Sequence, residues 1–314
     1  MIPAKGAPSP PREDLAEESY REVRAALSRH GYHEAAVLRS LGAEALPDIF
    51  EGGFHESVAP GMEEGLDALV RVFLLGRGAP RQPLTELLGE SFVAAGLAQG
   101  MLREVDGGAR LYATVSMQPS PPGSDGVWIV SDRVVPAAEA ALPRTGDLVY
   151  PTVTPSARVF LQFLPRRRCE RFLEVCAGCG PAAMLAGEFA ASVTASDIDA
   201  RAIAYCRYNA RLNGITGFHS VTASLYEELG GEFDVIAAHP PFMPSEGPAE
   251  VFYGGGLDGT DLLRQLIAEL PGKLTPGGLF YSVAMIPEGD TCRLEERVSQ
   301  WLGGAKAEHD VFFF

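Results

Sequence analysis

The stretch LEVCAGCGPAAMLAG, residues 173–187, decides the fold because it reads as a buried strand, a glycine-rich turn and a helix. Gly178 and Gly180 stand where the backbone must turn tightly and where a ligand can approach without meeting a Cβ atom. Cys176 and Cys179 share a C-x-x-C spacing, but a tetrahedral metal site needs a second pair of ligands. We therefore expect no metal site and interpret the cysteines as small fillers of the turn.

Strands and helices alternate on both sides of this stretch. The predicted strands are 171–177, 192–197, 219–224, 233–242 and 279–285, and the predicted helices are 157–164, 181–190, 200–214 and 260–274. Strict alternation predicts an α/β fold with a doubly wound, mostly parallel, Rossmann-like sheet. Such sheets bind ligands at the carboxyl ends of their strands.

An acidic residue follows the turn at the sequence spacing expected for a ribose-binding carboxylate. Asp197 lies 19 residues after Gly178, at the end of the next predicted strand, where a carboxylate can accept both hydroxyl protons of a ribose. This pairing predicts a cofactor that carries adenosine. The third position of a G-x-G-x-x-G pattern is Ala183, so the glycines alone leave a nicotinamide dinucleotide and S-adenosylmethionine both open.

A family resemblance comes from the fourth strand. FDVIAAHPPF (233–242) resembles the Asn/Asp-Pro-Pro-Tyr/Phe motif of class I S-adenosylmethionine-dependent methyltransferases that modify planar amino nitrogens. FLEVCAGCG resembles the first motif of that family, and VTASDIDARAIAYCRYNARLNG resembles its second strand and helix. YGGGLDGTDLLRQLI is similar to the segment that follows the motif in release-factor glutamine methyltransferases and ribosomal RNA guanine methyltransferases. The resemblance covers about residues 155–285 and implies an enzyme of the Rossmann-like methyltransferase class.

The resemblance also implies a cofactor site for S-adenosyl-L-methionine. The residues it assigns to that site are Glu174, Cys176, Ala177, Gly178, Gly180, Asp197, Ile198, Ser224, Leu225 and His239. Glu174 and the two glycines would surround the methionine part, and Asp197 would hold the ribose. The chain departs from the family at Cys176, where the family keeps a glycine, and at Ser224, where an aspartate usually receives the adenine amino group. A serine hydroxyl still accepts a hydrogen bond, although a weaker one than a carboxylate does.

The residues implied for the transfer itself are His239, Pro240 and Phe242. In the family, the Asn or Asp side chain and the carbonyl of the following proline accept the two amino hydrogens, while the aromatic ring stacks on the acceptor. The imidazole of His239 can act as a simple hydrogen-bond acceptor or as a general base, and the sequence leaves both roles open. Candidate walls of the acceptor pocket, or else core residues, are Tyr150, Tyr226, Phe242 and Tyr253.

The expected function is methyl transfer from S-adenosyl-L-methionine to a nitrogen of a small molecule or a protein side chain. Three alternatives stay open: a cyclase of the azetidine-2-carboxylate synthase type that releases methylthioadenosine, a ribosomal RNA or other nucleic-acid methyltransferase, and a non-catalytic binding module. A formal charge of −15 argues against a nucleic-acid partner, because gripping phosphates requires clustered cations. The only dense cationic cluster in the sequence is Arg166, Arg167 and Arg168 with Arg171.

Two domains are predicted, an α-rich accessory domain over 1–145 and the methyltransferase domain over 146–314. Residues 17–41 predict two short helices broken at Gly31, and residues 61–119 predict three helices followed by a hairpin around an Asp-Gly-Gly turn. This order is typical of a winged helix. Residues 85–100 contain no Lys or Arg, which favours covering a substrate or homodimerisation over DNA binding. The tail 309–314 predicts a terminal strand with buried aromatic rings.

The compartment is predicted from absences in the sequence. No apolar run approaches the roughly 18 to 20 residues of a membrane helix, and the first residues lack the apolar core of a secretion signal. Five cysteines, an odd number, fit reduced thiols better than a disulfide framework. The protein is expected to be cytoplasmic and to have no membrane partner.

Overall fold

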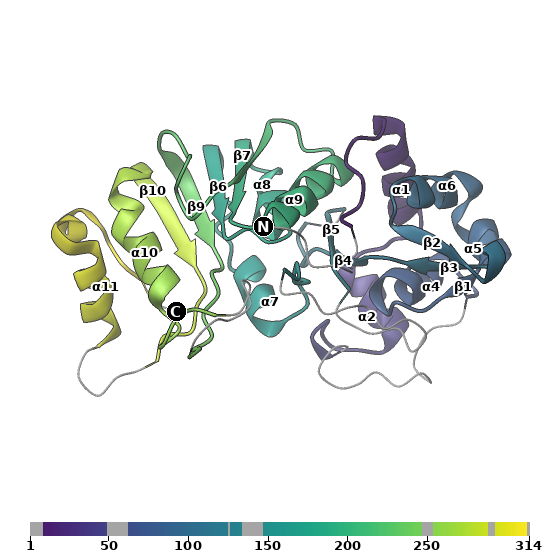
Figure 1. Ribbon diagram of the computed structural model, residues 1–314, viewed down its shortest axis with the longest axis horizontal. Helices are drawn as coiled ribbons and strands as arrows, with labels where there is room; N and C mark the ends of the chain where they lie inside the picture. Colours follow the sequence, from purple (N-terminus) through teal and green to yellow (C-terminus); the bar gives the residue numbers. More distant parts are fainter. Residues whose placement is uncertain are drawn as a thin grey trace.

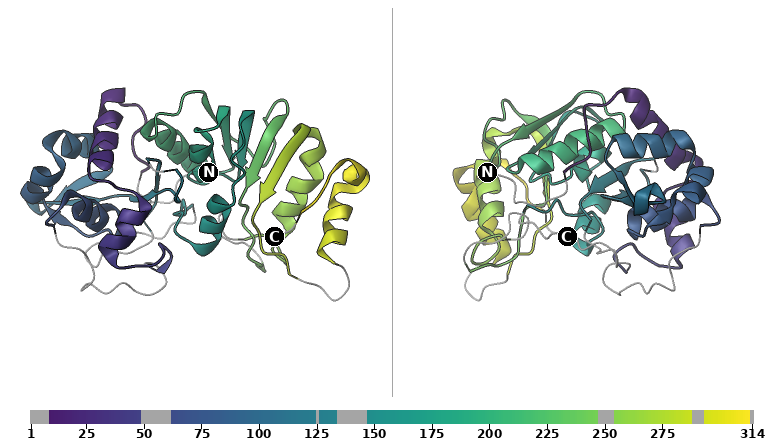
Figure 2. Two further views of the ribbon diagram at one scale, coloured as in Figure 1. Left: turned by 180° about the vertical axis from the view of Figure 1, so that it is seen from behind. Right: turned by 45° about the vertical axis from the view of Figure 1, so that its right-hand side comes forward.

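The computed structural model describes residues 9–48, 62–124, 126–133, 147–246, 254–287 and 293–312. The molecule has two lobes, with the amino-terminal elements at one end and a parallel sheet toward the other (Figure 1). The view from behind in Figure 2 shows α9 on the side of the sheet that faces the amino-terminal lobe and α11 at the far end of the molecule. Within the ranges that the structure describes, no helix is both long and apolar enough to cross a membrane.

The sheet of the second lobe has five strands that all run parallel, in the order β10-β9-β6-β7-β8. The strands are β6 (Cys169–Val175), β7 (Ala190–Asp197), β8 (Phe218–Thr222), β9 (Phe233–Ala238) and β10 (Leu274–Ser282). Strand order reverses between β6 and β9, and this switch point opens a crevice at the carboxyl ends of the strands. The predicted doubly wound α/β fold is confirmed.

Helices cover both faces of this sheet. They are α7 (Pro155–Gln162), α8 (Pro181–Ala186), α9 (Ala200–Leu212), α10 (Asp261–Glu269) and α11 (Leu294–Leu302), with short 3₁₀ turns η4 (Leu270–Gly272) and η5 (Gly303–Glu308). Phe172 and Leu173 are neighbours in β6 yet join different buried clusters, Phe172 with residues of α8 and α9 and Leu173 with residues of α10. Both faces of the strand are therefore buried over its second half, Phe172 to Val175.

The predicted strands and helices of this lobe are present, with shifted ends. The helix predicted over 181–190 ends at Ala186 because β7 begins at Ala190. The predicted terminal strand is wrong for the described part of the tail, where residues 309–312 form no strand and the Phe312 side chain is 83% exposed. Phe313 and Phe314 lie outside the described residues.

The amino-terminal lobe begins with the two expected helices, α1 (Glu17–Arg29) and α2 (Glu34–Leu41), on either side of Gly31. Further elements are α4 (Gly65–Leu69), the π-helical turn η2 (Val70–Leu74), β1 (Ala79–Pro80), α5 (Arg81–Leu88), α6 (Glu90–Ala98), β2 (Leu102–Val105), the 3₁₀ turn η3 (Asp106–Gly108) and β3 (Arg110–Ala113). β2 and β3 form the predicted antiparallel hairpin, and β1 pairs with the other edge of β3. The element order is as predicted, and assignment to the winged-helix class stays a prediction.

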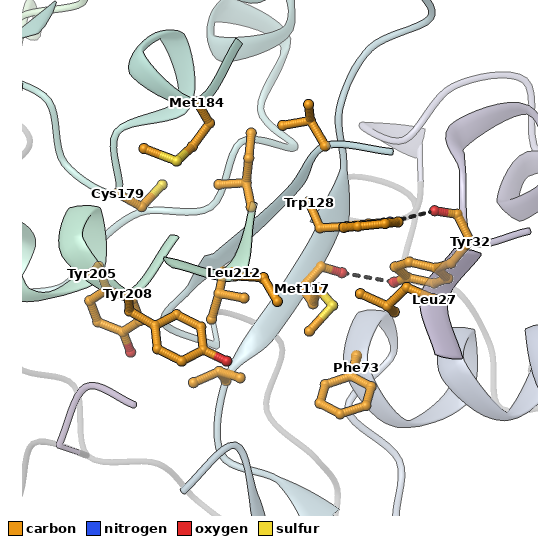
Figure 3. Packing of buried hydrophobic residues seen from close by; sticks show 14 of the residues in the cluster. Leu27, Tyr32, Phe73, Met117, Trp128, Cys179, Met184, Tyr205, Tyr208 and Leu212 are labelled. Atoms are coloured by element: carbon orange, nitrogen blue, oxygen red, sulfur yellow. Dashed lines mark hydrogen bonds between the residues drawn. The ribbon is translucent and has the colours of Figure 1, made fainter. Parts of the chain in front are cut away.

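A second hairpin, β4 (Ser116–Pro119) and β5 (Trp128–Ser131), lies between the lobes. Figure 3 shows its packing: the Trp128 indole N–H donates to the Tyr32 carbonyl at 2.7 Å, and the Tyr32 hydroxyl donates to the Met117 carbonyl at 2.8 Å. One buried apolar cluster continues from these residues to Tyr205 and Leu212 of α9. The core thus runs across the predicted boundary near residue 145, which itself stays a prediction.

Candidate active site

A cavity of about 450 Å³ lies at the carboxyl ends of β6, β7 and β9. Most of the residues predicted for the site line it: Glu174, Cys176, Ala177, Gly178, Asp197, Ile198, Ser224, Leu225, His239, Pro240 and Phe242. Gly180 belongs to the turn but does not line the cavity. Segments that are 65 residues apart in the sequence, from Glu174 to His239, therefore meet in one space.

The glycine-rich turn is shaped by left-handed backbone conformations. Gly178 has φ of 54° and Gly180 has φ of 75°, values that residues with a Cβ atom rarely adopt. A Cβ at Gly178 would meet nothing within 4 Å, whereas one at Gly180 would lie 3.0 Å from the Cys206 sulfur. Gly178 thus keeps space open beside the turn, and Gly180 permits close packing of α9.

Asp197 ties the turn to the end of β7. One carboxylate oxygen accepts the Gly178 N–H at 2.8 Å, and the other accepts the Asp199 N–H at 2.9 Å. Burial raises the pKa of Asp197, while these backbone hydrogen bonds act in the opposite direction. Asp197 also lines the cavity, and a carboxylate can accept more hydrogen bonds than these two.

Glu174 lies beneath the turn and is only 2% exposed. Its two carboxylate oxygens accept the N–H groups of Ala182 at 3.1 Å and Ala183 at 2.7 Å. These are amides of the first turn of α8, which otherwise lack intrahelical partners. Burial raises the pKa of Glu174 to about 8, against the lowering effect of the two amides. Glu174 therefore caps α8, a role that the sequence did not reveal.

His239 follows β9 and contacts two phenylalanine rings, stacked on Phe160 and tilted by 40° against Phe242. Its ring centroid lies 5.2 Å from that of Phe160 and 5.6 Å from that of Phe242. The Nε2 atom is buried and has no hydrogen-bond partner among the described residues. Burial lowers the pKa of His239 to about 4, so the imidazole is neutral at pH 7. A neutral ring offers one acceptor nitrogen to a ligand in the cavity.

The HPPF motif (239–242) is held by the glycine-rich segment that follows it. The Gly255 N–H donates to the Met243 carbonyl at 2.9 Å, and the Ser245 N–H donates to the Gly256 carbonyl at 2.9 Å. A Cβ at Gly259 would lie 2.2 Å from the Phe242 carbonyl oxygen. Within the described part, 254–259, the glycines allow this segment to pack directly on the motif.

Of the two cysteines of the turn, Cys179 is buried and Cys176 is partly buried. Burial raises the pKa of both Cys176 and Cys179, which disfavours the reactive thiolate. Cys176 packs beside the cluster that includes Leu173 and Tyr226. In the ranges that the structure describes, no group of three or more His, Cys, Asp or Glu side chains is arranged to hold a metal.

Of the other predicted acceptor walls, Tyr150 lines the cavity and is 41% exposed. Tyr226 does not line the cavity; the residue is 2% exposed and packs in the core, so the core alternative holds for it and the wall alternative does not. Tyr253 lies outside the described residues.

Sequence reasoning found only Tyr150 in one wall of the cavity, the segment 147–157 that leads into α7. Its lining residues are Asp147, Leu148, Val149, Tyr150, Pro151, Thr152, Thr154, Ser156 and Ala157. The Cys179 thiol lies 3.6 Å from the Tyr150 carbonyl, which places this segment directly against the turn. The sequence signal near this segment is the helix start at Thr154 and Pro155. It predicts where α7 begins but not where the preceding residues lie relative to the turn.

Comparison with known proteins agrees with this geometry. Residues 148–303 match the methyltransferase small domain family. The release factor glutamine methyltransferase of Deinococcus radiodurans is 30% identical over 188 residues, which are 56% of this chain and 63% of that protein. The ribosomal protein uL3 glutamine methyltransferase of Bradyrhizobium diazoefficiens is 30% identical over 161 residues, 46% of this chain and 50% of that protein.

A third relative modifies RNA according to its name. The ribosomal RNA small subunit methyltransferase C of Chromohalobacter salexigens is 32% identical over 119 residues, 37% of this chain and 31% of that protein. The chain thus spans about half the length of the curated relatives that it matches. Through residues 148–303, the chain belongs to the methyltransferase small domain family of class I S-adenosylmethionine-dependent methyltransferases.

Proposed function

We propose that the cavity binds S-adenosyl-L-methionine and directs its methyl group to a planar nitrogen, an amide or amine of a protein side chain or a small molecule. The observation that carries this proposal is the meeting of two predicted groups in one cavity. The glycine turn with Asp197 forms one part of the lining, and His239 with Pro240 and Phe242 forms another.

The charges around the cavity support this cofactor over a dinucleotide. Besides Glu174, whose raised pKa keeps it mostly protonated at pH 7, the acidic lining residues among those described are Asp147, Asp197 and Asp199, and none of the lining residues is Lys or Arg. A sulfonium and an ammonium suit such surroundings, whereas a pyrophosphate does not. The first amides of α8, where a dinucleotide would place its pyrophosphate, are already bonded to Glu174. The cavity volume also lies within the range of ordinary cofactor sites.

When bound, the cofactor supplies an electrophilic methyl group on a sulfonium. The chain's own contribution is to hold the acceptor nitrogen in line with that group, roughly 3 to 3.5 Å away. In our proposal, Nε2 of His239 and the Pro240 carbonyl accept the hydrogens of the acceptor, and the Phe242 ring lies against its plane. The low pKa of His239 favours the hydrogen-bond acceptor role over the general-base role.

The cationic cluster supports a protein or small-molecule acceptor over nucleic acid. Arg166 donates to the Gly123 carbonyl at 2.7 Å, Arg167 to the Gly277 carbonyl at 3.2 Å, and Arg171 to the Glu232 carbonyl at 2.7 Å. These arginines bond to the turn between β4 and β5, to β10 and to the residue before β9, and none of them lines the cavity. Two of the relatives above are named as glutamine methyltransferases, and a glutamine side-chain amide is a planar acceptor of the proposed kind.

The experiment compares the products formed by the pure protein with and without an acceptor. S-adenosylmethionine alone, then with glutamine-containing peptides, then with total ribosomal RNA, would be incubated with the protein and analysed by mass. S-adenosylhomocysteine formed only with peptide supports the proposal. Methylthioadenosine without any acceptor would instead establish a cyclase, and methylated RNA would establish a nucleic-acid enzyme. Binding without any product would leave a binding module.

The remaining assignments rest on the sequence. We propose that residues 1–145 form an accessory domain that covers the acceptor and that the protein acts in the cytoplasm. We also propose a homodimer, which light scattering would detect.

A further inference from the structure

α9 carries polar side chains at intervals of four residues, Arg201, Tyr205 and Asn209, and its C-cap residue Asn213 continues the series. Residues spaced by four lie on the same side of a helix. All four contact β5 or the residue directly after it, and they meet Trp128, Val130 and Asp132, at intervals of two.

The two asparagines pair with the backbone of β5 as a neighbouring strand would. The Asn213 side chain accepts the Trp128 N–H at 2.9 Å and donates to the Trp128 carbonyl at 2.8 Å. The Asn209 side chain accepts the Val130 N–H at 2.9 Å and donates to the Val130 carbonyl at 2.9 Å. In the described sheets β5 pairs only with β4, so α9 satisfies its other edge.

The polar stripe of α9, the row Arg201, Tyr205, Asn209 and Asn213, also contacts Asp132, just beyond β5. The Tyr205 hydroxyl donates to the Asp132 carboxylate at 2.7 Å, and Arg201 forms an ion pair with the same carboxylate. The match works because four residues of helix rise about 6.0 Å, while two residues of strand rise about 6.6 Å. A polar stripe on one helix can therefore follow a strand edge over three successive contacts.

Asn209 makes one contact that Asn213 does not. Its side-chain N–H also donates to the Cys179 carbonyl at 2.8 Å, and Asn209 is completely buried. Cys179 lies between the two glycines of the turn and lines the cavity. Asn209 therefore links the backbone of the inter-lobe hairpin to the backbone of the proposed cofactor turn.

We infer that Asn209 is a positioning residue for cofactor binding: its side-chain bond to the Cys179 carbonyl holds the turn in its binding geometry, while the same side chain is anchored to Val130 of β5. This inference rests on the proposed function for the identity of the cofactor. It makes the hairpin β4–β5 part of the cofactor site, although no residue of the hairpin lines the cavity.

The test compares Asn209→Ala with Asn213→Ala, a matched variant that breaks the same kind of pairing to β5 without touching the turn. The dissociation constant of S-adenosylmethionine would be measured by calorimetry. We expect Asn209→Ala to weaken binding by about tenfold or more, since it leaves the buried Cys179 carbonyl without its donor. Asn213→Ala should stay within about threefold of the wild type. Equal dissociation constants for the two variants would overturn the inference.

A second readout requires no cofactor. Hydrogen exchange of the ligand-free proteins should be faster over residues 176–183 in Asn209→Ala, while Asn213→Ala should speed exchange only around Trp128. Unchanged exchange at the turn in Asn209→Ala would contradict the inference. If either alanine variant fails to fold, the Asn209→Ser and Asn213→Ser pair serves the same comparison. A wild type that binds no S-adenosylmethionine would refute the proposed function, and the exchange experiment would still decide the link.

Discussion

The rings of His239 and Phe160 lie nearly parallel, with an angle of 18° between their planes, and Phe160 stacks in the same way on Tyr281. The Tyr281 hydroxyl donates to the Phe160 carbonyl at 3.1 Å, which fixes the outer end of this stack. A buried imidazole with no carboxylate bonded to it among the described residues has little to stabilise its charged form. Burial therefore explains why His239 is neutral, and the stack on Phe160 holds the ring in place at the cavity.

His239→Asn tests whether the ring acts only as an acceptor. The asparagine carbonyl can accept the same hydrogen bond, so kcat/KM should remain within about threefold of the wild type, while His239→Ala should lose about tenfold or more, roughly 1.4 kcal/mol of barrier. Steady-state kinetics with the acceptor that the product experiment reveals would measure both. A loss of activity in His239→Asn as large as that in His239→Ala would mean that the imidazole does more than accept.

The lowered pKa of His239 predicts a specific pH dependence of stability. The unfolded chain binds a proton at this residue near pH 6.5, whereas the folded protein does so only near pH 4. The contribution of His239 is thus complete above pH 6.5 and is lost as the pH falls toward 4. Urea unfolding of the wild type and His239→Asn between pH 4 and 7 should show a smaller acid-induced loss in the variant. Parallel curves would count against a buried neutral imidazole.

Glu174 predicts the opposite trend at higher pH. Its pKa is about 8 in the folded protein and near 4.5 when unfolded, so the folded state holds the extra proton in this window. The contribution is complete below about pH 4.5 and declines as the pH rises toward 8, by at most about 1.4 kcal/mol per pH unit. Glu174→Gln should remove this slope. Free energies of unfolding measured for both proteins from pH 5 to 8 would reveal it, and an unchanged slope would contradict the prediction.

Gly259 tests how the HPPF motif is held. In Gly259→Ala, the new Cβ would lie 2.2 Å from the Phe242 carbonyl oxygen, in a backbone with φ of 79°, so the motif must move. We expect kcat/KM for the acceptor to fall by about tenfold or more, since a displacement of about 1 Å can cost two orders of magnitude in rate. Binding of S-adenosylmethionine should change little, because the turn is untouched.

Gly272→Ala is the matched control for that variant, since a Cβ there meets nothing within 4 Å. Both proteins would be compared by acceptor kinetics and by calorimetry with the cofactor. Normal activity in Gly259→Ala would show that the motif tolerates displacement.

Cys176 tests backbone strain in the turn. Its φ of 54° lies in the left-handed region, which costs an L-residue about 1–2 kcal/mol. A β-branched side chain suffers more there, so Cys176→Val should lower the free energy of unfolding by at least about 1 kcal/mol. Cys176→Gly should remain within about 1 kcal/mol of the wild type, because relief of strain offsets lost packing. Urea unfolding measures both, and a valine variant as stable as the wild type would argue against strain.

Sequence patterns predicted the fold well where periodicity and turns are local. The alternation of strands and helices, the Asp-Gly-Gly hairpin and the glycine turn each depend on neighbouring residues, and each is present. The gathering of Glu174 and His239 in one cavity also followed, because parallel strands end at the same edge. Local patterns do not indicate which group a buried polar side chain will bond to. The capping of α8 by Glu174 was therefore not predicted. Most of the wall formed by 147–157 was missed for the same reason, since its position depends on contacts with distant residues such as Cys179.

The helix-to-strand register between α9 and β5 also constrains how this protein can change length over evolution. A one-residue deletion inside α9 would rotate the following part of its stripe by about 100° and separate at least one asparagine from its partner. A deletion inside β5 would turn Trp128 or Val130 to the opposite face. We therefore expect insertions and deletions to accumulate in the connection before Trp128 rather than in either element.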